Sequence, residues 1–175
     1  MTNFDKSCKK CGEIFTPFRT FDKLCYLCTK TEQALKNLEK MKKEQKKKQK
    51  EDLLTLQDYL KLAQAVFNKF INLRDQGKNC ISCFKPIKGR VNASHYYNAN
   101  NHYALRFDEE NVHSSCITCN QFLHGNLIQY RKGLIERIGE ANLKRLDELS
   151  SSTRRFTKEE LKELIREYKE KIKYF

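Results

Sequence analysis

Two short stretches, Cys80-Ile81-Ser82-Cys83 and Cys116-Ile117-Thr118-Cys119-Asn120, decide how the second half of this 175-residue chain folds. Each places two cysteines three positions apart, and four thiolates from two such pairs form the closed tetrahedral site of a structural zinc ion. Two further pairs lie near the N-terminus: Cys8 and Cys11, Cys25 and Cys28. Because all eight cysteines fall into such pairs, the sequence predicts two structural Zn²⁺ ions.

The composition favours a small, helix-rich architecture. Charged residues make up 33% of the chain and apolar residues 39%, with no tryptophan and only two prolines. A chain of this length holds one ordinary domain, or a small domain with helical appendages, rather than one large enzyme core. We therefore expect an α+β protein whose thin cores are stabilised by zinc.

The net charge favours a polyanionic partner. Lysine and arginine number 35 against 22 aspartates and glutamates, which gives +13 at pH 7. Such a surplus attracts nucleic acid over long range. An ordinary basic surface is the alternative that charge alone leaves open, and the combination with zinc modules favours nucleic acid.

The N-terminal residues, Met1-Thr2-Asn3-Phe4-Asp5, carry neither the basic nor the apolar segment of a secretory signal. No run in the chain approaches the roughly 18 apolar residues of a membrane span. We expect a cytoplasmic protein without membrane contact, where reduced thiols bind metal rather than form disulfides. A redox role for a CxxC pair would require a βαβ context that the sequence lacks.

The sequence pattern divides the chain into four predicted segments. Residues 1–30 form an N-terminal zinc ribbon or treble-clef module, and residues 31–75 a long helical segment. Residues 76–126 form a zinc-braced module that contains the catalytic candidates, and residues 127–175 form C-terminal helices. No internal repeat is present beyond the recurrence of paired CxxC motifs.

Local signals refine the helical parts of this division. The lysine-rich run between residues 42 and 50 predicts a solvated linker helix or a basic rod along phosphates. Thr55 with Asp58, and Thr157 with Glu160, have the spacing of helix-capping boxes. A further helix is expected to stop at Gly139. In the first module, three phenylalanines are expected to cover the metal: Phe15, Phe18 and Phe21.

Polar residues around the last two cysteine pairs suggest a site for phosphodiester hydrolysis. That reaction needs a base for water and a cation that positions the phosphate. His95 is the candidate base, since a neutral imidazole with a pKa of about 6.5 suits the task. Asn120, through its side-chain oxygen, is the candidate ligand for Mg²⁺ or Mn²⁺, and His124 is the second. Residues four apart share a helix face, so Asn120 and His124 are expected to point at one site.

The order of these residues resembles the HNH, or ββα-metal, nuclease fold. In that fold a hairpin carries the base histidine, a following asparagine bonds to backbone and fixes the loop, and a helix supplies a metal ligand. His95, Asn111 and Asn120 match these positions in order. The resemblance extends to phage endonuclease VII, in which CxxC pairs brace the fold. Asn111 could equally cap a turn, and His102 and His113 are expected to have no catalytic role.

A second resemblance covers more of the chain and rests on five stretches: CGEIFTPF (residues 11–18), LCYLC (24–28), ASHYY (93–97), LRFDEENVHSSCITCN (105–120) and HGNLIQYRKGLIERIG (124–139). In these stretches the chain resembles the lambdoid phage NinG, or Rap, family of recombination proteins. The resemblance implies a metal-dependent endonuclease that cuts Holliday junctions and D-loops in the cytoplasm of a bacterial host.

The chain departs from the HNH pattern at one metal position. Many such sites carry an aspartate directly before the base histidine, where this chain has Ser94, and Asn92 stands where relatives are expected to carry an acidic residue. This departure predicts either a lower metal affinity or compensation by Asp108 or His124.

Two alternatives remain open from the sequence: a zinc-stabilised DNA-binding protein without catalysis, and an HNH nuclease of linear duplex DNA. Symmetric cleavage of a junction takes two active sites, so the nuclease hypothesis predicts a homodimer. The helix from Leu56 to Phe70 and the C-terminal helix are the interface candidates. No small-molecule cofactor is expected.

Overall fold

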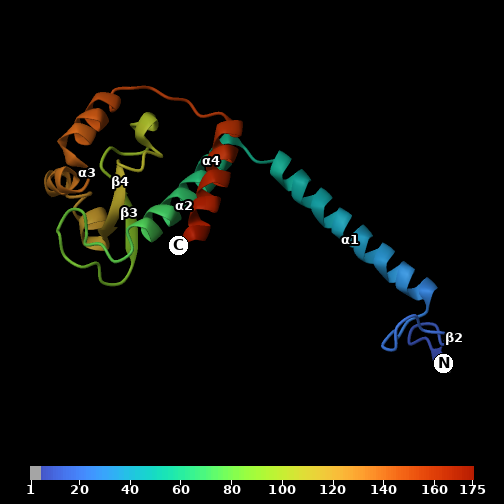
Figure 1. The fold of residues 1–175 in the computed structure, drawn as a ribbon. Helices are drawn as coiled ribbons and strands as arrows, with labels where there is room; N and C mark the ends of the chain where they lie inside the picture. The colour runs from blue at the N-terminus through green and yellow to red at the C-terminus, as the bar shows by residue number, and fades with distance from the viewer. Residues whose placement is uncertain (1–4) are drawn as a thin grey trace. The chain divides into compact units, whose positions relative to one another are not determined.

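The computed structural model describes residues 5–175 (Figure 1). The chain forms two compact units, and the boundary between them in the sequence lies between Leu54 and Thr55. This division falls inside the predicted helical segment 31–75. Residues 1–4, part of the predicted first zinc module and of the stretch without signal-sequence features, lie outside the described residues.

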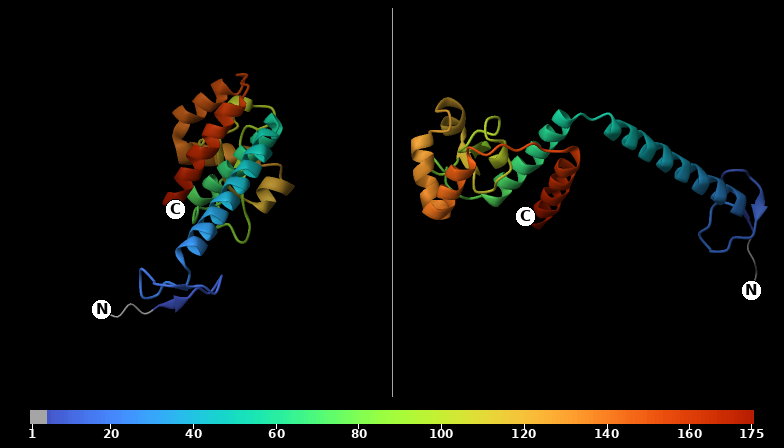
Figure 2. Two further views of the ribbon diagram at one scale, coloured as in Figure 1. Left: turned by 90° about the vertical axis from the view of Figure 1, so that its right-hand side faces the viewer. Right: turned by 90° about the horizontal axis from the view of Figure 1, so that it is seen from above.

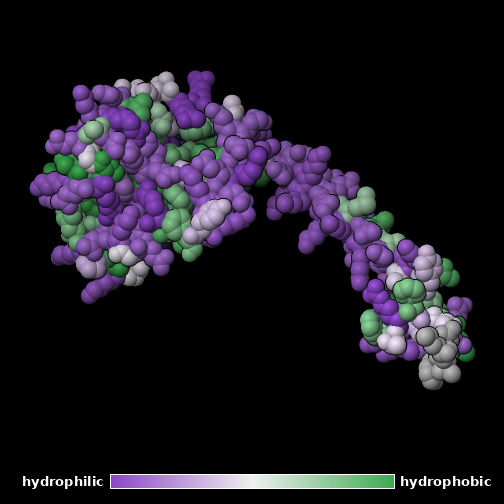
Figure 3. Space-filling model, viewed as in Figure 1, coloured by the Kyte–Doolittle hydropathy of each residue, from purple (hydrophilic) through white to green (hydrophobic). Residues whose placement is uncertain are grey.

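The first unit consists of a short hairpin and one long helix. Strands β1 (Lys6–Ser7) and β2 (Ile14–Phe15) pair antiparallel, and α1 spans Tyr26–Asp52. Helix α1 buries no side chain. An isolated helix is held by its own hydrogen bonds and propensity rather than by packing, so the lysine-rich run forms a solvated helix. Figure 3 shows mostly hydrophilic surface along α1.

The phenylalanines of the first unit do not form the expected cover over the cysteines. Phe18 is 96% exposed and Phe21 is 71% exposed, whereas Phe15 is half-buried. The buried side chains of this unit, within the described residues, are Cys8 and Cys25. Two-residue strands offer too little surface to bury large rings, so the prediction of an aromatic core around the metal was wrong.

The second unit begins with α2 (Leu56–Arg74) and ends with α4 (Lys158–Lys171), which pack side by side (Figures 1 and 2). Both predicted capping boxes are confirmed, one at the N-terminus of each helix. Their apolar faces meet in a core that also includes β4: Phe67, Phe70, Ile71, Val112 and Tyr168. The two stripes cover each other within the chain, and the dimer interface stays a prediction.

A two-stranded sheet lies between these helices in the sequence. Strands β3 (Val91–His95) and β4 (Val112–Cys116) pair antiparallel, with His95 opposite Val112. A π-helical turn, η2 (Thr118–Phe122), follows β4. Short 3₁₀ turns complete the unit: η1 (Tyr103–Leu105) and η3 (Ile172–Tyr174).

Helix α3 (Leu127–Leu149) follows η2 and is interrupted at Gly139, where φ is 79° and ψ is 164°. The predicted stop at this glycine is confirmed. Another glycine, Gly133, packs directly on backbone, since a Cβ there would lie 2.1 Å from the Ile81 carbonyl oxygen. Only glycine therefore allows α3 to approach the Cys80–Cys83 turn this closely.

A buried carboxylate joins α2 to β4. Asp75 follows the last residue of α2 and accepts a hydrogen bond from the Ser114 N–H at 2.9 Å. Burial alone would raise the pKa of the Asp75 carboxyl, but bonds from His113, Arg74 and Lys78 hold it well below its usual range. The ionised group therefore ties the helix end to the strand that carries the fourth cysteine pair.

The predicted mixture of helix and sheet with two cysteine clusters is confirmed. None of the helices in the described part of the chain combines the length and the apolar character that a bilayer crossing requires.

Candidate functional site

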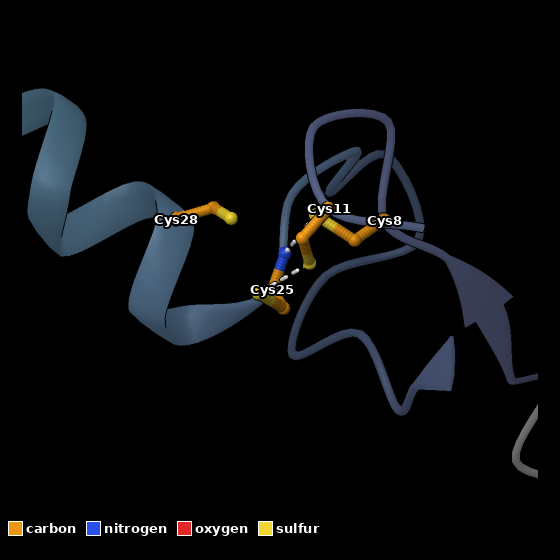
Figure 4. A group of neighbouring side chains, drawn as sticks. All are labelled: Cys8, Cys11, Cys25 and Cys28. Atoms are coloured by element: carbon orange, nitrogen blue, oxygen red, sulfur yellow. Dashed lines mark hydrogen bonds between the residues drawn. The ribbon is translucent and has the colours of Figure 1, made fainter. Parts of the chain in front are cut away.

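The four cysteines of the first unit converge on one point (Figure 4). Their sulfur atoms all lie within 4.8 Å of one another, and Cys11 Sγ is 3.7 Å from Cys25 Sγ. Tetrahedral ligands at about 2.3 Å from zinc would be separated by about 3.8 Å. The Cys25 N–H also donates to Cys8 Sγ at 3.3 Å, a bond that favours the thiolate. This cluster could hold a zinc ion.

The second unit contains a matching cluster: Cys80, Cys83, Cys116 and Cys119. The Sγ atoms of Cys83 and Cys116 are 3.9 Å apart. Backbone N–H groups again face sulfur, from Cys116 to Cys80 Sγ at 3.4 Å and from Cys119 to Cys116 Sγ at 3.4 Å. The two predicted ligand sets are therefore assembled, and each could hold one zinc ion.

The pKa values of the thiols in the first cluster favour the binding of a cation. The backbone N–H of Cys25 lowers the pKa of Cys8 to about 6, whereas the neighbouring Cys25 thiol raises the pKa of Cys28 to about 12. One thiol of the cluster thus ionises readily and another resists ionisation. A divalent cation would stabilise the thiolates together, which is the condition for structural zinc binding.

Three of the four candidate catalytic residues line one hollow in the second unit. His95, Asn120 and His124 share this space of about 430 Å³. The hollow is completed by the end of β3, by the loop that follows it and by the turn before α3: Ala93, Ser94, Asn98, Ala99, Asn100 and Gly125. The run Asn98-Ala99-Asn100 was not predicted as part of the site, although its position soon after His95 was a signal in the sequence.

His95 is held in one tautomer at the end of β3. Its Nε2 lies 3.0 Å from the carbonyl oxygen of Arg106. A carbonyl can only accept, so Nε2 carries the proton and Nδ1 presents a lone pair. Burial lowers the pKa of the imidazole below its usual 6.5, an effect that the Arg106 carbonyl opposes and the Arg106 guanidinium reinforces. The ring is therefore neutral at pH 7 and able to accept a proton.

Asn111 is fully buried and bonds to the two ends of the loop that follows His95. Its Nδ2 donates to the Leu105 carbonyl at 2.9 Å and to the Tyr97 carbonyl at 3.0 Å. The Tyr97 N–H donates in return to Asn111 Oδ1 at 2.8 Å. Leu105 directly precedes Arg106, so these bonds also fix the carbonyl that orients His95.

Replacing Asn111 with alanine is expected to lower the free energy of unfolding by about 3 kcal/mol, because two part-buried backbone groups of Tyr97 lose their bonds to Asn111 and the Leu105 carbonyl keeps only the Asp108 N–H. Urea denaturation followed by circular dichroism measures this change. Asn101→Ala, at an exposed position in the same loop, is the control and should change stability by less than about 0.5 kcal/mol. Equal stability of the two variants would contradict the prediction.

Asn120 and His124 line one hollow, as predicted, but they do not share a helix face, so the helical reason for that prediction was wrong. Turn η2 ends at Phe122, and His124 adopts a left-handed conformation with φ of 47°. Both residues reach the hollow because the backbone reverses around Gly125, whose N–H donates to the Cys119 carbonyl at 2.8 Å. Ser82 Oγ donates to the Gly125 carbonyl at 2.9 Å. The second cysteine cluster therefore anchors the turn that carries His124.

The carboxylate expected to compensate for Ser94 is not available. Both oxygens of Asp108 accept bonds from Arg145, at 2.8 and 3.0 Å, and Asp108 does not line the hollow. Ser94 itself is buried, and its hydroxyl has no hydrogen-bond partner within residues 5–175.

The other two histidines bond to the scaffold. His102 Nδ1 lies 2.7 Å from the Ser150 carbonyl oxygen, and His113 lies between Asp75 and the Glu110 carbonyl. Neither histidine lines the hollow.

Comparison with known proteins gives one family. A family model described as Bacteriophage Lambda NinG protein matches residues 2–175. The chain is 43% identical over 117 residues to protein ninG of Salmonella phage P22, and 40% identical over 117 residues to protein ninG of Escherichia phage lambda. Each match covers 66% of this chain and 56% of the relative, so the chain spans about half the length of the curated relatives it matches. No solved structure matches this chain.

Proposed function

This chain belongs to the NinG family of lambdoid phage proteins, and from that premise we propose that it is a metal-dependent DNA endonuclease of the HNH type. The proposed substrate is branched DNA, including Holliday junctions and D-loops, cut during phage recombination in the host cytoplasm. The observation that carries the proposal is the neutral His95, oriented by the Arg106 carbonyl, in one hollow with Asn120 and His124.

In the proposed mechanism, His95 Nδ1 accepts a proton from the attacking water. The bond from Nε2 to the Arg106 carbonyl holds the ring in place and becomes stronger as the imidazolium forms. Asn111 keeps that carbonyl in position through its bond to Leu105. The protein thus supplies an oriented base on a rigid backbone frame.

Asn120, through its side-chain oxygen, and His124 would hold a Mg²⁺ or Mn²⁺ ion, which when bound supplies stabilisation of negative charge on the phosphate. The residues of the hollow fit such an ion, since Mg²⁺ keeps several waters and needs few protein ligands. Because no carboxylate belongs to the described lining of the hollow, we expect weak metal binding in the absence of DNA phosphate.

The charge of the chain supports DNA as the partner, since +13 at pH 7 attracts a polyanion to the protein. We also propose a homodimer, because symmetric resolution of a junction takes two active sites. Light scattering with and without junction DNA tests this part.

The decisive experiment compares a four-way junction, a D-loop and a linear duplex of matched sequence, each with and without Mg²⁺ or Mn²⁺. We expect cleavage of the two branched substrates only, and only with the metal. Equal cleavage of the linear duplex would favour an HNH nuclease without branch selectivity.

The lack of a carboxylate in the described lining favours one second candidate, a zinc-stabilised DNA-binding protein without catalysis. Binding of all three substrates without cleavage under any metal condition would favour it over the nuclease.

A further inference from the structure

The turn that carries His124 also presents large apolar side chains to solvent. Phe122 is 73% exposed and Ile128 is 77% exposed, and Leu123 and Leu127 between them are about half exposed. We name these four residues the apolar rim: Phe122, Leu123, Leu127 and Ile128. Large exposed apolar side chains that gather in one short segment commonly mark a binding surface.

The apolar rim belongs to the same backbone segment as the candidate metal ligands. Asn120 precedes it, and His124 and Gly125, which line the hollow, lie within it. A molecule that places a phosphate in the hollow therefore lies beside the rim. This continuity relates the rim to the substrate of the hollow.

Hydrogen bonds hold the backbone that carries the apolar rim in a fixed conformation. The Gly125 N–H bonds to the Cys119 carbonyl, Ser82 bonds to the Gly125 carbonyl, and the Leu123 N–H bonds to the Thr118 carbonyl at 3.0 Å. Cys119 belongs to the second cysteine cluster. Side chains on a rigid backbone can contact or enter between stacked bases while the backbone that carries them keeps its conformation.

Linear duplex DNA offers few favourable contacts to the exposed apolar side chains of the rim. Its bases are stacked, and its outer surface is phosphate and sugar, with which apolar side chains gain no favourable contact. A branch point differs, because bases at the crossover can unstack and expose apolar faces. Aromatic rings stack on splayed bases, whereas apolar side chains that enter a continuous duplex must first unstack a base step at a cost of a few kcal/mol.

We propose that the apolar rim contacts unstacked bases at the branch point and thereby gives the protein its preference for branched over linear DNA. This inference rests on the proposed function and deepens it by assigning the residues that determine substrate selectivity. Lys132, exposed on the following turn of α3, is placed to contact the flanking phosphates, whereas the neighbouring Arg131 is paired with Asp147.

The test is competition binding of the full-length protein to a four-way junction and a linear duplex of the same sequence, with Ca²⁺ in place of Mg²⁺. The double variant Phe122→Ser and Ile128→Ser should lose about tenfold or more of the junction preference and keep its affinity for the linear duplex. Leu62→Ser, which removes an exposed leucine from α2, is the matched control and should keep the preference. Zinc content and circular dichroism show that each variant is folded.

Unchanged junction preference in the folded double variant would overturn the inference. So would an equal loss for both DNA forms, or a loss that accompanies dissociation of a dimer in light scattering, since the rim would then join two copies. The proposed function is tested separately. If the wild type prefers junctions through the rim but cleaves no DNA, the inference about the rim stands and the proposed nuclease activity is wrong.

Discussion

Replacing His95 with alanine is expected to reduce cleavage of branched DNA by about 10²- to 10⁴-fold, the usual contribution of a general base. The hollow would keep Asn120 and His124 but lose the group that accepts the proton of water. Single-turnover cleavage of a four-way junction with saturating Mn²⁺ measures the rate. Binding affinity and its salt dependence should stay near those of the wild type, because they depend on phosphate contacts.

His102→Ala is the matched control for this experiment. His102 also bonds to a backbone carbonyl, that of Ser150, but does not line the hollow. We expect this variant to retain cleavage within a few fold of the wild type. If His95→Ala cleaved as fast as the wild type, His95 would not be the base.

Replacing Cys80 with serine is expected to remove one zinc ion per chain and to abolish both the ordered hollow and cleavage. Structural zinc sites contribute on the order of 10 kcal/mol in small domains, which is comparable with the whole stability of a domain. The turn that carries His124 bonds to the Cys119 carbonyl and to Ser82, so it depends directly on this cluster. Zinc analysis, thermal unfolding and junction cleavage together measure the result.

Cys28→Ser provides the comparison, because it removes a ligand of the other cluster. Cys28 belongs to the first unit, which is separate from the unit that contains the hollow. This variant should also lose one zinc ion but retain the thermal transition of the second unit and its intrinsic cleavage. Loss of cleavage in Cys28→Ser, with the second unit still folded, would show that the first unit takes part in the reaction.

Features that depend on neighbouring residues were predictable from the sequence. The cysteine clusters assemble because each CxxC pair brings two thiols together within one turn of backbone. The capping boxes at Thr55 and Thr157 form because the side chain and the N–H that it caps are three residues apart. The break at Gly139 follows from a positive φ, which glycine adopts without strain.

Features that depend on packing between distant segments were predicted less well. The exposure of Phe18 and Phe21 reflects how little surface the short hairpin offers, which spacing does not reveal. The apolar stripes of α2 and α4 cover each other, a contact that helical spacing alone does not reveal. His124 leaves the helical register of Asn120 because the second cysteine cluster holds the turn around Gly125.

The sequence by itself determined the two sets of zinc ligands and the order of His95, Asn111 and Asn120, because both depend on residue identity and local spacing. Only the tertiary structure decided three further features. The Arg106 carbonyl selects the tautomer of His95, and Asn111 joins the two ends of the loop between them. The apolar rim stands exposed beside the hollow. The first two depend on hydrogen bonds between residues 6 to 14 positions apart, and the third on which side chains the packed fold leaves exposed, so none of them follows from immediate neighbours in the sequence.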